Sequence, residues 1–192
     1  TLYLLEHLRY YDDYVRSGEY ANSDSFCHME RKFSELSGKT WGIIGLGAIG
    51  KKVAQIATAF GCEVIYYSAS GKKRSDEYRQ VDLDTLLKGS DIVSCHAPLN
   101  EKTYHLMDAE AFGKMKETAL FINVGRGPIV NEKDLAKALK KGKIAAAGLD
   151  VLEEEPMRKD NPLRKLEVGD RLLITPHIAW AAVEARTRLL HE

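Results

Sequence analysis

The ten residues Trp41–Gly50, WGIIGLGAIG, restrict the fold of this chain more than any other stretch. A short apolar run leads into Gly45, Gly47 and Gly50, which stand at G-x-G-x-x-G spacing. The first glycine permits a tight turn, the second lets the backbone approach a pyrophosphate, and the third lets a helix pack closely on a strand. The start of that helix offers unpaired N–H groups to an anion. The spacing is typical of dinucleotide binding, although glycines also mark ordinary turns.

The sequence around the turn supports the dinucleotide interpretation. Ile43 and Ile44 precede the glycines, and apolar residues then recur at helical spacing until Gly61. The segment Glu63–Tyr67, EVIYY, has the β-branched and aromatic composition of a strand. Strand, turn, helix and strand therefore follow one another in the order that a nucleotide-binding unit requires.

The rest of the chain continues this alternation of strands and helices. Helix caps are predicted at Asp82, Asp108 and Asn131. Four further strands are predicted at Asp91–Cys95, Ala119–Val124, Ile144–Leu149 and Leu172–Thr175. Alternation of this kind favours an α/β fold, a doubly wound parallel sheet of the Rossmann type with helices on both faces. We assign this domain to residues 40–179.

Composition excludes several classes of function. Basic and acidic residues both number 28 in the 192-residue chain, so no basic patch indicates nucleic acid. No apolar run approaches the ~18 residues that a membrane span needs. The cysteines Cys27, Cys62 and Cys95 lack C-x-x-C spacing, which indicates reduced thiols in a cytoplasmic protein and no metal site.

Two segments flank the predicted domain. Residues 1–39 contain a predicted helix, Thr1–Arg16, followed by a polar arm, and residues 180–192 contain the start of another helix at Val183–Leu190. The first helix has apolar residues on more than one side, so it is either a simple amphipathic helix or one that also packs against a partner. Because the chain starts without methionine inside a helical pattern, we expect a piece of a longer polypeptide.

Polar residues follow the predicted strand ends, where open parallel sheets bind their ligands. An arginine there can hold a carboxylate by a two-point fork, and a histidine can exchange a proton with a substrate oxygen near neutral pH. A carboxylate beside the histidine favours its charged form and fixes its orientation. The residues concerned are Ser68, His96, Arg126, Asp150, Glu155 and His177.

Each of the three chemically suggestive residues has a plainer explanation. Arg126 lies in a Gly-Arg-Gly turn and could be a solvated loop residue. His177 could be a surface or capping histidine, and Glu155 ends an acidic run, which is usually a solvated face. Sequence pattern alone does not pair these residues.

Four motifs in order resemble a known family. They are GLGAIG, INVGRGPIV (Ile122–Val130), GLDVLEEEP (Gly148–Pro156) and TPHIAW (Thr175–Trp180). Together they resemble the D-isomer-specific 2-hydroxyacid dehydrogenases, and TPHIAW is most similar to the glycerate dehydrogenase/hydroxypyruvate reductase branch. The resemblance implies hydride transfer between NAD(P) and a small 2-hydroxy or 2-keto acid.

The resemblance also implies residue roles. Arg126 would bind the substrate, His177 would be the acid/base, and Glu155 would be its carboxylate partner, while Asp150 would contact the nicotinamide end. The other implied cofactor contacts lie in the glycine turn and after the strands, at Gly45, Gly47, Ala48, Ile49, Gly50, Ser68, Lys72, Lys73, Arg74, His96, Ala97, Pro98, Thr103, Val124, Gly125 and Ala179.

This chain departs from the family pattern in two ways. Ser68 stands where many members carry an acidic residue that binds the adenine ribose. Because Lys72, Lys73 and Arg74 follow closely and could bind a 2′-phosphate, NADP becomes a candidate cofactor. The alternative is that the three basic residues form only a basic surface turn. The substrate domain is also absent, so we expect an excised nucleotide-binding domain, nearly inactive alone. In the family the first helix and arm help form a homodimer.

The alternative function is a dinucleotide-sensing corepressor, which shares the fold.

Overall fold

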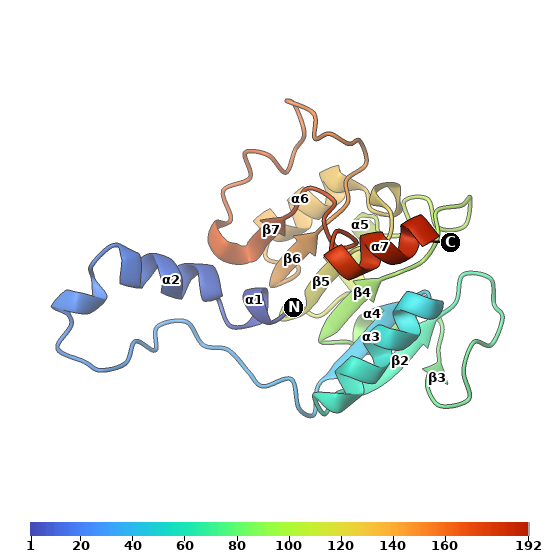
Figure 1. Ribbon diagram of the computed structural model, residues 1–192, viewed down its shortest axis with the longest axis horizontal. Helices are drawn as coiled ribbons and strands as arrows, with labels where there is room; N and C mark the ends of the chain where they lie inside the picture. The colour runs from blue at the N-terminus through green and yellow to red at the C-terminus, as the bar shows by residue number, and fades with distance from the viewer. Residues whose placement is uncertain (192) are drawn as a thin grey trace.

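The computed structural model describes residues 1–191 and is built around a twisted sheet of parallel strands (Figure 1). Among the described residues the sheet has seven strands in the order β3-β2-β1-β4-β5-β6-β7. The order reverses between β1 and β4, which is the switch point of a doubly wound fold. The predicted fold class is therefore confirmed. The strands are β1 (Thr40–Ile44), β2 (Glu63–Tyr67), β3 (Arg79–Gln80), β4 (Ile92–Cys95), β5 (Leu120–Asn123), β6 (Ala146–Leu149) and β7 (Leu172–Ile174).

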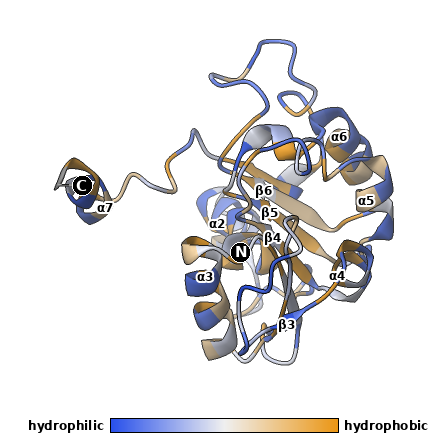
Figure 2. Ribbon diagram, turned by 90° about the vertical axis from the view of Figure 1, so that its right-hand side faces the viewer, coloured by the Kyte–Doolittle hydropathy of each residue, from blue (hydrophilic) through white to orange (hydrophobic). Residues whose placement is uncertain are grey.

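Helices cover both faces of the sheet (Figure 2). Helix α3 (Ala48–Ala59) and the short α1 (Leu2–Leu5) lie on one face, while α4 (Leu83–Gly89), α5 (Ala109–Lys114) and α6 (Glu132–Lys140) lie on the other. The predicted caps are confirmed, because the side chains of Asp82, Asp108 and Asn131 each accept a hydrogen bond from a backbone N–H of the first turn.

The core consists of two clusters separated by the sheet. Successive residues of a strand point to opposite faces, so Ile43 and Ile92 join the cluster under α3, whereas Ile44 and Val93 join the cluster under α4, α5 and α6. All four side chains are fully buried. Burial on both faces explains why these strands are continuous apolar runs without alternation.

Strand β3 was not predicted. It is a two-residue edge strand, Arg79–Gln80, that pairs with Ile65 and Tyr66 of β2. Its side chains are partly or fully exposed and show no apolar alternation, so the sequence carries no strand signal there. The Tyr66 hydroxyl donates to Gln80 Oε1 (3.1 Å), which fixes the edge from inside the sheet.

The predicted single helix over Thr1–Arg16 is wrong, because the structure divides it into α1 and α2 (Leu8–Arg16). His7 interrupts the helix with a left-handed backbone (φ 53°). Its Nδ1 lies 2.8 Å from Asp170 Oδ2 near the other end of the chain. A tertiary contact of this kind overrides the local helical pattern, and only Leu4 of this segment is buried.

Helix α2 and the arm after it extend away from the sheet (Figure 1). The arm contains one 3₁₀ turn, η1 (Tyr20–Asn22), and folds back so that His28 stacks on Tyr14 with ring centres 3.8 Å apart. At the other end, α7 (Val183–His191) stands away from the sheet in Figure 2. Within the part of the chain that the structure describes, no helix is long and apolar enough to cross a membrane.

Candidate active site

The glycine turn has the geometry that its spacing predicts. Gly45 adopts φ +93°, and a Cβ there would lie 2.6 Å from the Ala97 nitrogen. A Cβ at Gly50 would collide with the carbonyl oxygen of Gly45, so helix and turn approach as closely as backbone allows. A Cβ at Gly47 would meet nothing within 4 Å. The turn is therefore packed on its inner side and open at Gly47, where α3 begins.

A cleft of about 500 Å³ adjoins this open side at the carboxyl ends of β4 and β5. It lies at the switch point of the sheet, where open α/β folds bind their ligands. The sequence analysis did not include one lining residue, Leu99. Its large apolar side chain is exposed in the structure. The lining residues are Ile49, His96, Ala97, Pro98, Leu99, Val124, Gly125 and Arg126.

His96 is the titratable side chain that burial affects most in this cleft. Burial lowers its pKa to about 4, so its imidazole is neutral at physiological pH. Its Nε2 lies 3.0 Å from Ser94 Oγ, which accepts a hydrogen bond from the Trp41 indole (2.9 Å). The Ser94 hydroxyl hydrogen is then free for Nε2, which assigns the ring proton to Nδ1. Nδ1 is buried and has no partner among the described residues.

The loop after β2 places the predicted basic residues unequally. Ser68 is buried, with its Oγ 3.1 Å from Ser70 Oγ. Arg74 reaches the same Ser70 Oγ (3.4 Å), whereas Lys73 is engaged by an ion pair with Asp76, and Lys72 is exposed. A second hollow of about 590 Å³ beside Ser70 is also lined by Asn100, Glu101 and Lys102, three residues that the sequence did not single out.

Thr103 lies inside the loop after β4 and not on its surface. Its side chain is fully buried, and Oγ1 donates to the Pro98 carbonyl (2.7 Å) and accepts from the Asn100 backbone N–H (2.8 Å). The hydroxyl is thus saturated by the loop itself. Thr103 shapes the Pro98–Thr103 loop that forms one wall of both hollows.

Asp150 follows β6 and organises the backbone around His177. Its carboxylate accepts hydrogen bonds from Thr175 Oγ1 (2.6 Å) and from the backbone N–H groups of Ile178 and Ala179 (2.8 Å each). The Asp150 carbonyl also accepts from the His177 N–H (2.9 Å). His177 adopts a left-handed backbone (φ 53°) between these contacts, and such a conformation persists only where the surroundings enforce it.

The structure brings Glu155 and His177 together. Glu155 Oε2 lies 2.6 Å from His177 Nδ1, although the two residues are 22 positions apart. The other carboxylate oxygen of Glu155 accepts the Leu152 N–H (2.8 Å), so one oxygen holds the loop and the other holds the imidazole. Nδ1 of His177 points at the carboxylate, which leaves Nε2 for a substrate. A hollow of about 550 Å³ beside the pair is lined mostly by apolar residues.

Arg126 is exposed, and its guanidinium donates within its own turn, to the Gly125 carbonyl (2.8 Å). Asn123, fully buried, fixes that turn by donating to the Arg126 carbonyl (3.0 Å) and accepting the Gly125 N–H (3.0 Å). No hydrogen bond or ion pair joins Arg126 to Glu155 or His177 within the described residues. Its backbone neighbour Gly127 nevertheless packs directly against the loop that carries Glu155.

The model of one protein family matches residues 1–179, and its description reads D-isomer specific 2-hydroxyacid dehydrogenase, NAD binding domain. The chain belongs to this family. The hydroxypyruvate reductase of Blautia hydrogenotrophica is 39% identical over 98% of this chain and 58% of its own length. The glyoxylate reductase of Thermofilum pendens is 47% identical over 81% of this chain and 46% of its own length.

Solved structures of related enzymes have the same fold. The D-lactate dehydrogenase of Aquifex aeolicus, complexed with NAD and lactic acid, superposes with a TM-score of 0.85 at 34% identity, over 99% of this chain and 60% of that one. The acyclic imino acid reductase Bsp5, in complex with NADPH and D-Arg, gives a TM-score of 0.87 at 35% identity, over 99% and 58%. This 2-hydroxyacid dehydrogenase chain thus spans about half the length of the relatives it matches, as the NAD-binding domain.

The geometry agrees with a bound dinucleotide. The open face of Gly47 and the N–H groups at the start of α3 adjoin the cleft at the switch point, which His96 also lines. For metals, the structure shows no group of three or more suitable side chains among the residues it describes.

Proposed function

We propose that this chain is the cofactor-binding half of an oxidoreductase that interconverts a small D-2-hydroxy acid and its 2-keto acid, of the glycerate/hydroxypyruvate or glyoxylate class. The 2.6 Å contact between Glu155 and His177 carries this proposal. A histidine with a carboxylate partner, beyond the carboxyl ends of β6 and β7 and so at the same edge of the sheet as the cleft, is suited to acid/base catalysis. The names of the relatives support the substrate class.

The residues have complementary tasks in the reduction of a 2-keto acid. Arg126 holds the substrate carboxylate and polarises its carbonyl through charge-assisted hydrogen bonds. A bound nicotinamide supplies the hydride. His177 gives the proton on Nε2 to the carbonyl oxygen, while Glu155 stabilises the imidazolium at Nδ1 and fixes its direction. In the reverse direction His177 takes that proton back.

The implied cofactor residues divide into two kinds in this proposal. Gly47, Ala48, Ile49, His96 and Val124 line the open turn or the cleft and contact the dinucleotide directly. The side chains of Asp150 and Thr103 form hydrogen bonds to the protein's own backbone, so these residues act by shaping the loops around the site. Gly45 and Gly50 act in the same indirect way, by letting turn and helix approach.

The test of the reaction uses the full-length protein that joins this chain to a substrate domain. We expect NAD(P)H-dependent turnover of hydroxypyruvate or glyoxylate in a panel of 2-keto acids. Arg126→Ala should raise KM and lower kcat, whereas Glu155→Gln should lower kcat with little change in KM, since Glu155 bonds His177 and its own loop but not the substrate. Binding of dinucleotide without turnover of any acid in the panel would contradict the proposal. That outcome would favour the corepressor alternative, for which we find no supporting observation.

We further propose that NADPH is accepted at least as well as NADH. Ser68 removes a carboxylate that would repel a 2′-phosphate, and Arg74 is the cation placed closest to it through Ser70. One charge-assisted contact contributes about 1.5–3 kcal/mol, or roughly tenfold to a hundredfold in affinity. The structure of Bsp5 with NADPH supports binding of this cofactor by the same fold.

The cofactor proposal has a matched control within one loop. Ser68→Asp should shift the ratio of dissociation constants toward NADH by at least tenfold. Arg74→Ala should weaken NADPH alone, whereas Lys73→Ala should change little, because Lys73 is already paired with Asp76. A wild-type preference for NADH above tenfold would contradict our interpretation of Ser68. Glu101 lines the neighbouring hollow, and its negative charge would repel the 2′-phosphate of NADPH. Glu101→Gln should therefore strengthen the binding of NADPH.

We also propose that residues 1–39 form a homodimer contact, that residues 40–179 form the NAD(P)-binding domain and that residues 180–192 begin the helix leading to a substrate domain. The exposed apolar side chains of Leu8, Val15, Phe26 and Met29 support the first of these. Free thiols at all three cysteines support a cytoplasmic location.

A further inference from the structure

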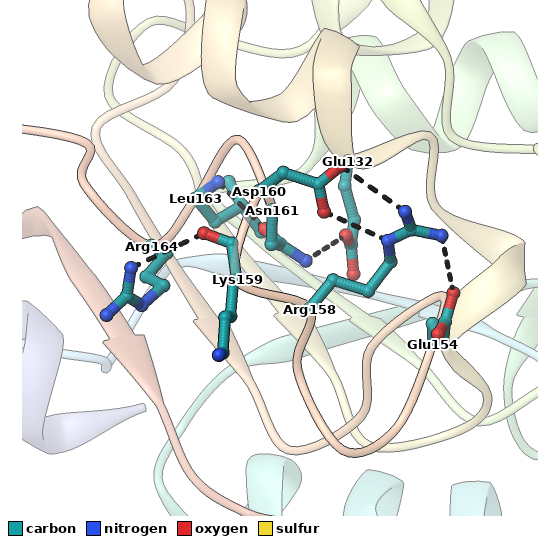
Figure 3. A network of polar contacts seen from close by, with 8 residues as sticks. All are labelled: Glu132, Glu154, Arg158, Lys159, Asp160, Asn161, Leu163 and Arg164. Carbon is teal, nitrogen blue, oxygen red and sulfur yellow. Dashed lines mark hydrogen bonds and ion pairs between the residues drawn. The ribbon is translucent and has the colours of Figure 1, made fainter.

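A buried carboxylate outside the proposed reaction holds the loop that carries Glu155. Glu132 is the first residue of α6, and only 5% of it is exposed. Burial disfavours the charged form of this carboxyl and raises its pKa. Hydrogen bonds to both carboxylate oxygens offset part of the cost of that burial. Figure 3 shows it joined to Asn161, within a group of polar contacts in the segment Glu154–Arg164.

The bonds of Glu132 run in both directions to Glu153. Glu132 Oε1 accepts the Glu153 N–H (2.7 Å), and Glu153 Oε1 accepts the Glu132 N–H (2.8 Å). Glu132 Oε2 accepts from Asn161 Nδ2 (2.6 Å), as the dashed line in Figure 3 marks. One carboxylate therefore ties the start of α6 to two points of the loop between β6 and η3 (Gly169–Arg171), one near the start of the loop at Glu153 and one past its middle at Asn161.

This anchor lies two residues before Glu155. From Glu153 the chain makes a tight turn in which Leu152 N–H is held by Glu155 Oε1, and Oε2 then faces His177. On the other side, Gly127 packs so closely that a Cβ there would collide with the Leu152 carbonyl. The turn is thus held by Glu132 from α6 and by Gly127 from the Arg126 turn.

We propose that Glu132 is a positioning residue, whose carboxylate fixes the Leu152–Glu155 turn so that Glu155 meets His177. This rests on the proposed function, in which Glu155 and His177 form the acid/base pair. Glu132 acts through the loop and touches neither substrate nor cofactor.

The hydrogen-bond inventory shows why a carboxylate is required. Asn161 Oδ1 accepts the Leu163 N–H (2.8 Å), so the amide cannot turn over without losing that bond. Asn161 Nδ2 and Glu153 N–H therefore both present donors to residue 132. A glutamine has one acceptor oxygen, so Glu132→Gln leaves a buried donor facing its amide. Combining it with Asn161→Asp restores every bond, because the new amide then donates to the new carboxylate.

The experiment reads the His177 tautomer in the 192-residue chain by ¹⁵N NMR of the imidazole. A ring that donates from Nδ1 to Glu155 is held as the Nδ1–H form, and release of that bond shifts the ring toward Nε2–H. Glu155→Ala sets the signal of complete loss. We expect Glu132→Gln to move the population at least half of the way to that value and Glu132→Gln/Asn161→Asp to restore it.

The outcomes separate the positioning role from the function. A wild-type signal in folded Glu132→Gln, beside a changed signal in Glu155→Ala, overturns the positioning role only. No restoration in the double variant overturns it too, because the effect would then be general disruption. An unchanged signal in Glu155→Ala removes the pair and with it the proposed function. If Glu132→Gln does not fold, Asn161→Ser is the second variant: it removes the bond to Glu132 Oε2 together with the acceptor of the Leu163 N–H, and it leaves both bonds between Glu132 and Glu153 in place. It should give a smaller shift in the same direction, and no shift overturns the proposal.

Discussion

At the scale of single residues, the site depends on side chains that serve the backbone. Asp150 receives three hydrogen bonds from the segment around His177, and Asn123 holds both sides of the Arg126 turn. Their short polar side chains follow strand ends directly, so the sheet fixes their positions. The reacting groups are then displayed on loops whose geometry the buried residues determine.

His96 makes stability depend on pH in a way that can be isolated. Its pKa is about 4 in the folded chain and about 6.5 when unfolded, so between these values the unfolded state binds the extra proton. Stability should therefore fall as pH drops from about 6.5 to about 4, by about 3 kcal/mol from this group. Urea unfolding at several pH values measures it. His96→Gln is the control, and its dependence on pH should be shallower; equal slopes would contradict the assignment.

At the scale of elements, the strongest sequence signals gave the most accurate predictions. The strand Glu63–Tyr67 and the helices capped by Asp82, Asp108 and Asn131 form where caps and apolar runs place them. The break at His7 and the edge strand β3 were missed because both depend on partners distant in sequence, Asp170 and Tyr66. The pairing of Glu155 with His177 came from the resemblance, since residue spacing alone contains no information about two loops meeting.

Two glycines test how closely the elements must approach. Gly127→Ala would push a Cβ into the Leu152 backbone and should destabilise the chain by about 1–3 kcal/mol or more. Gly113→Ala is the control, because Gly113 lies in α5 with nothing near its missing Cβ; a helical alanine there should stabilise by about 0.5–1 kcal/mol. Chemical unfolding of both variants decides, and similar values for the two would show that the Gly127 contact is unimportant.

At the scale of the whole molecule, exposed apolar side chains are unevenly distributed over the surface. The sheet and its helices bury two complete cores, whereas α2, its arm and α7 expose large apolar side chains. Phe26 is 91% exposed and Leu190 85% exposed. Helix α2 and its arm lie away from the sheet in Figure 1, and α7 lies away from it in Figure 2, which agrees with the proposed contacts to a second copy and to a substrate domain.

The proposed dimer can be tested on this chain. Sedimentation at tens of micromolar should give a dimer, since weak protein interfaces begin to dissociate below roughly this concentration. Phe26→Ser/Met29→Ser should shift it toward monomer while leaving the unfolding midpoint unchanged, because both side chains are exposed. A wild-type monomer at this concentration would count against the assignment of residues 1–39.

Titration calorimetry of the folded chain with NADH tests the central claim, that this is a dinucleotide-binding domain, most directly. We expect saturable binding at one site. Gly47→Val should weaken it at least tenfold with an unchanged unfolding midpoint, because Gly47 has an extended backbone and empty space where only the pyrophosphate would lie. Absence of binding by folded wild-type protein, to NADH and NADPH alike, or equal affinity in Gly47→Val, would contradict the account.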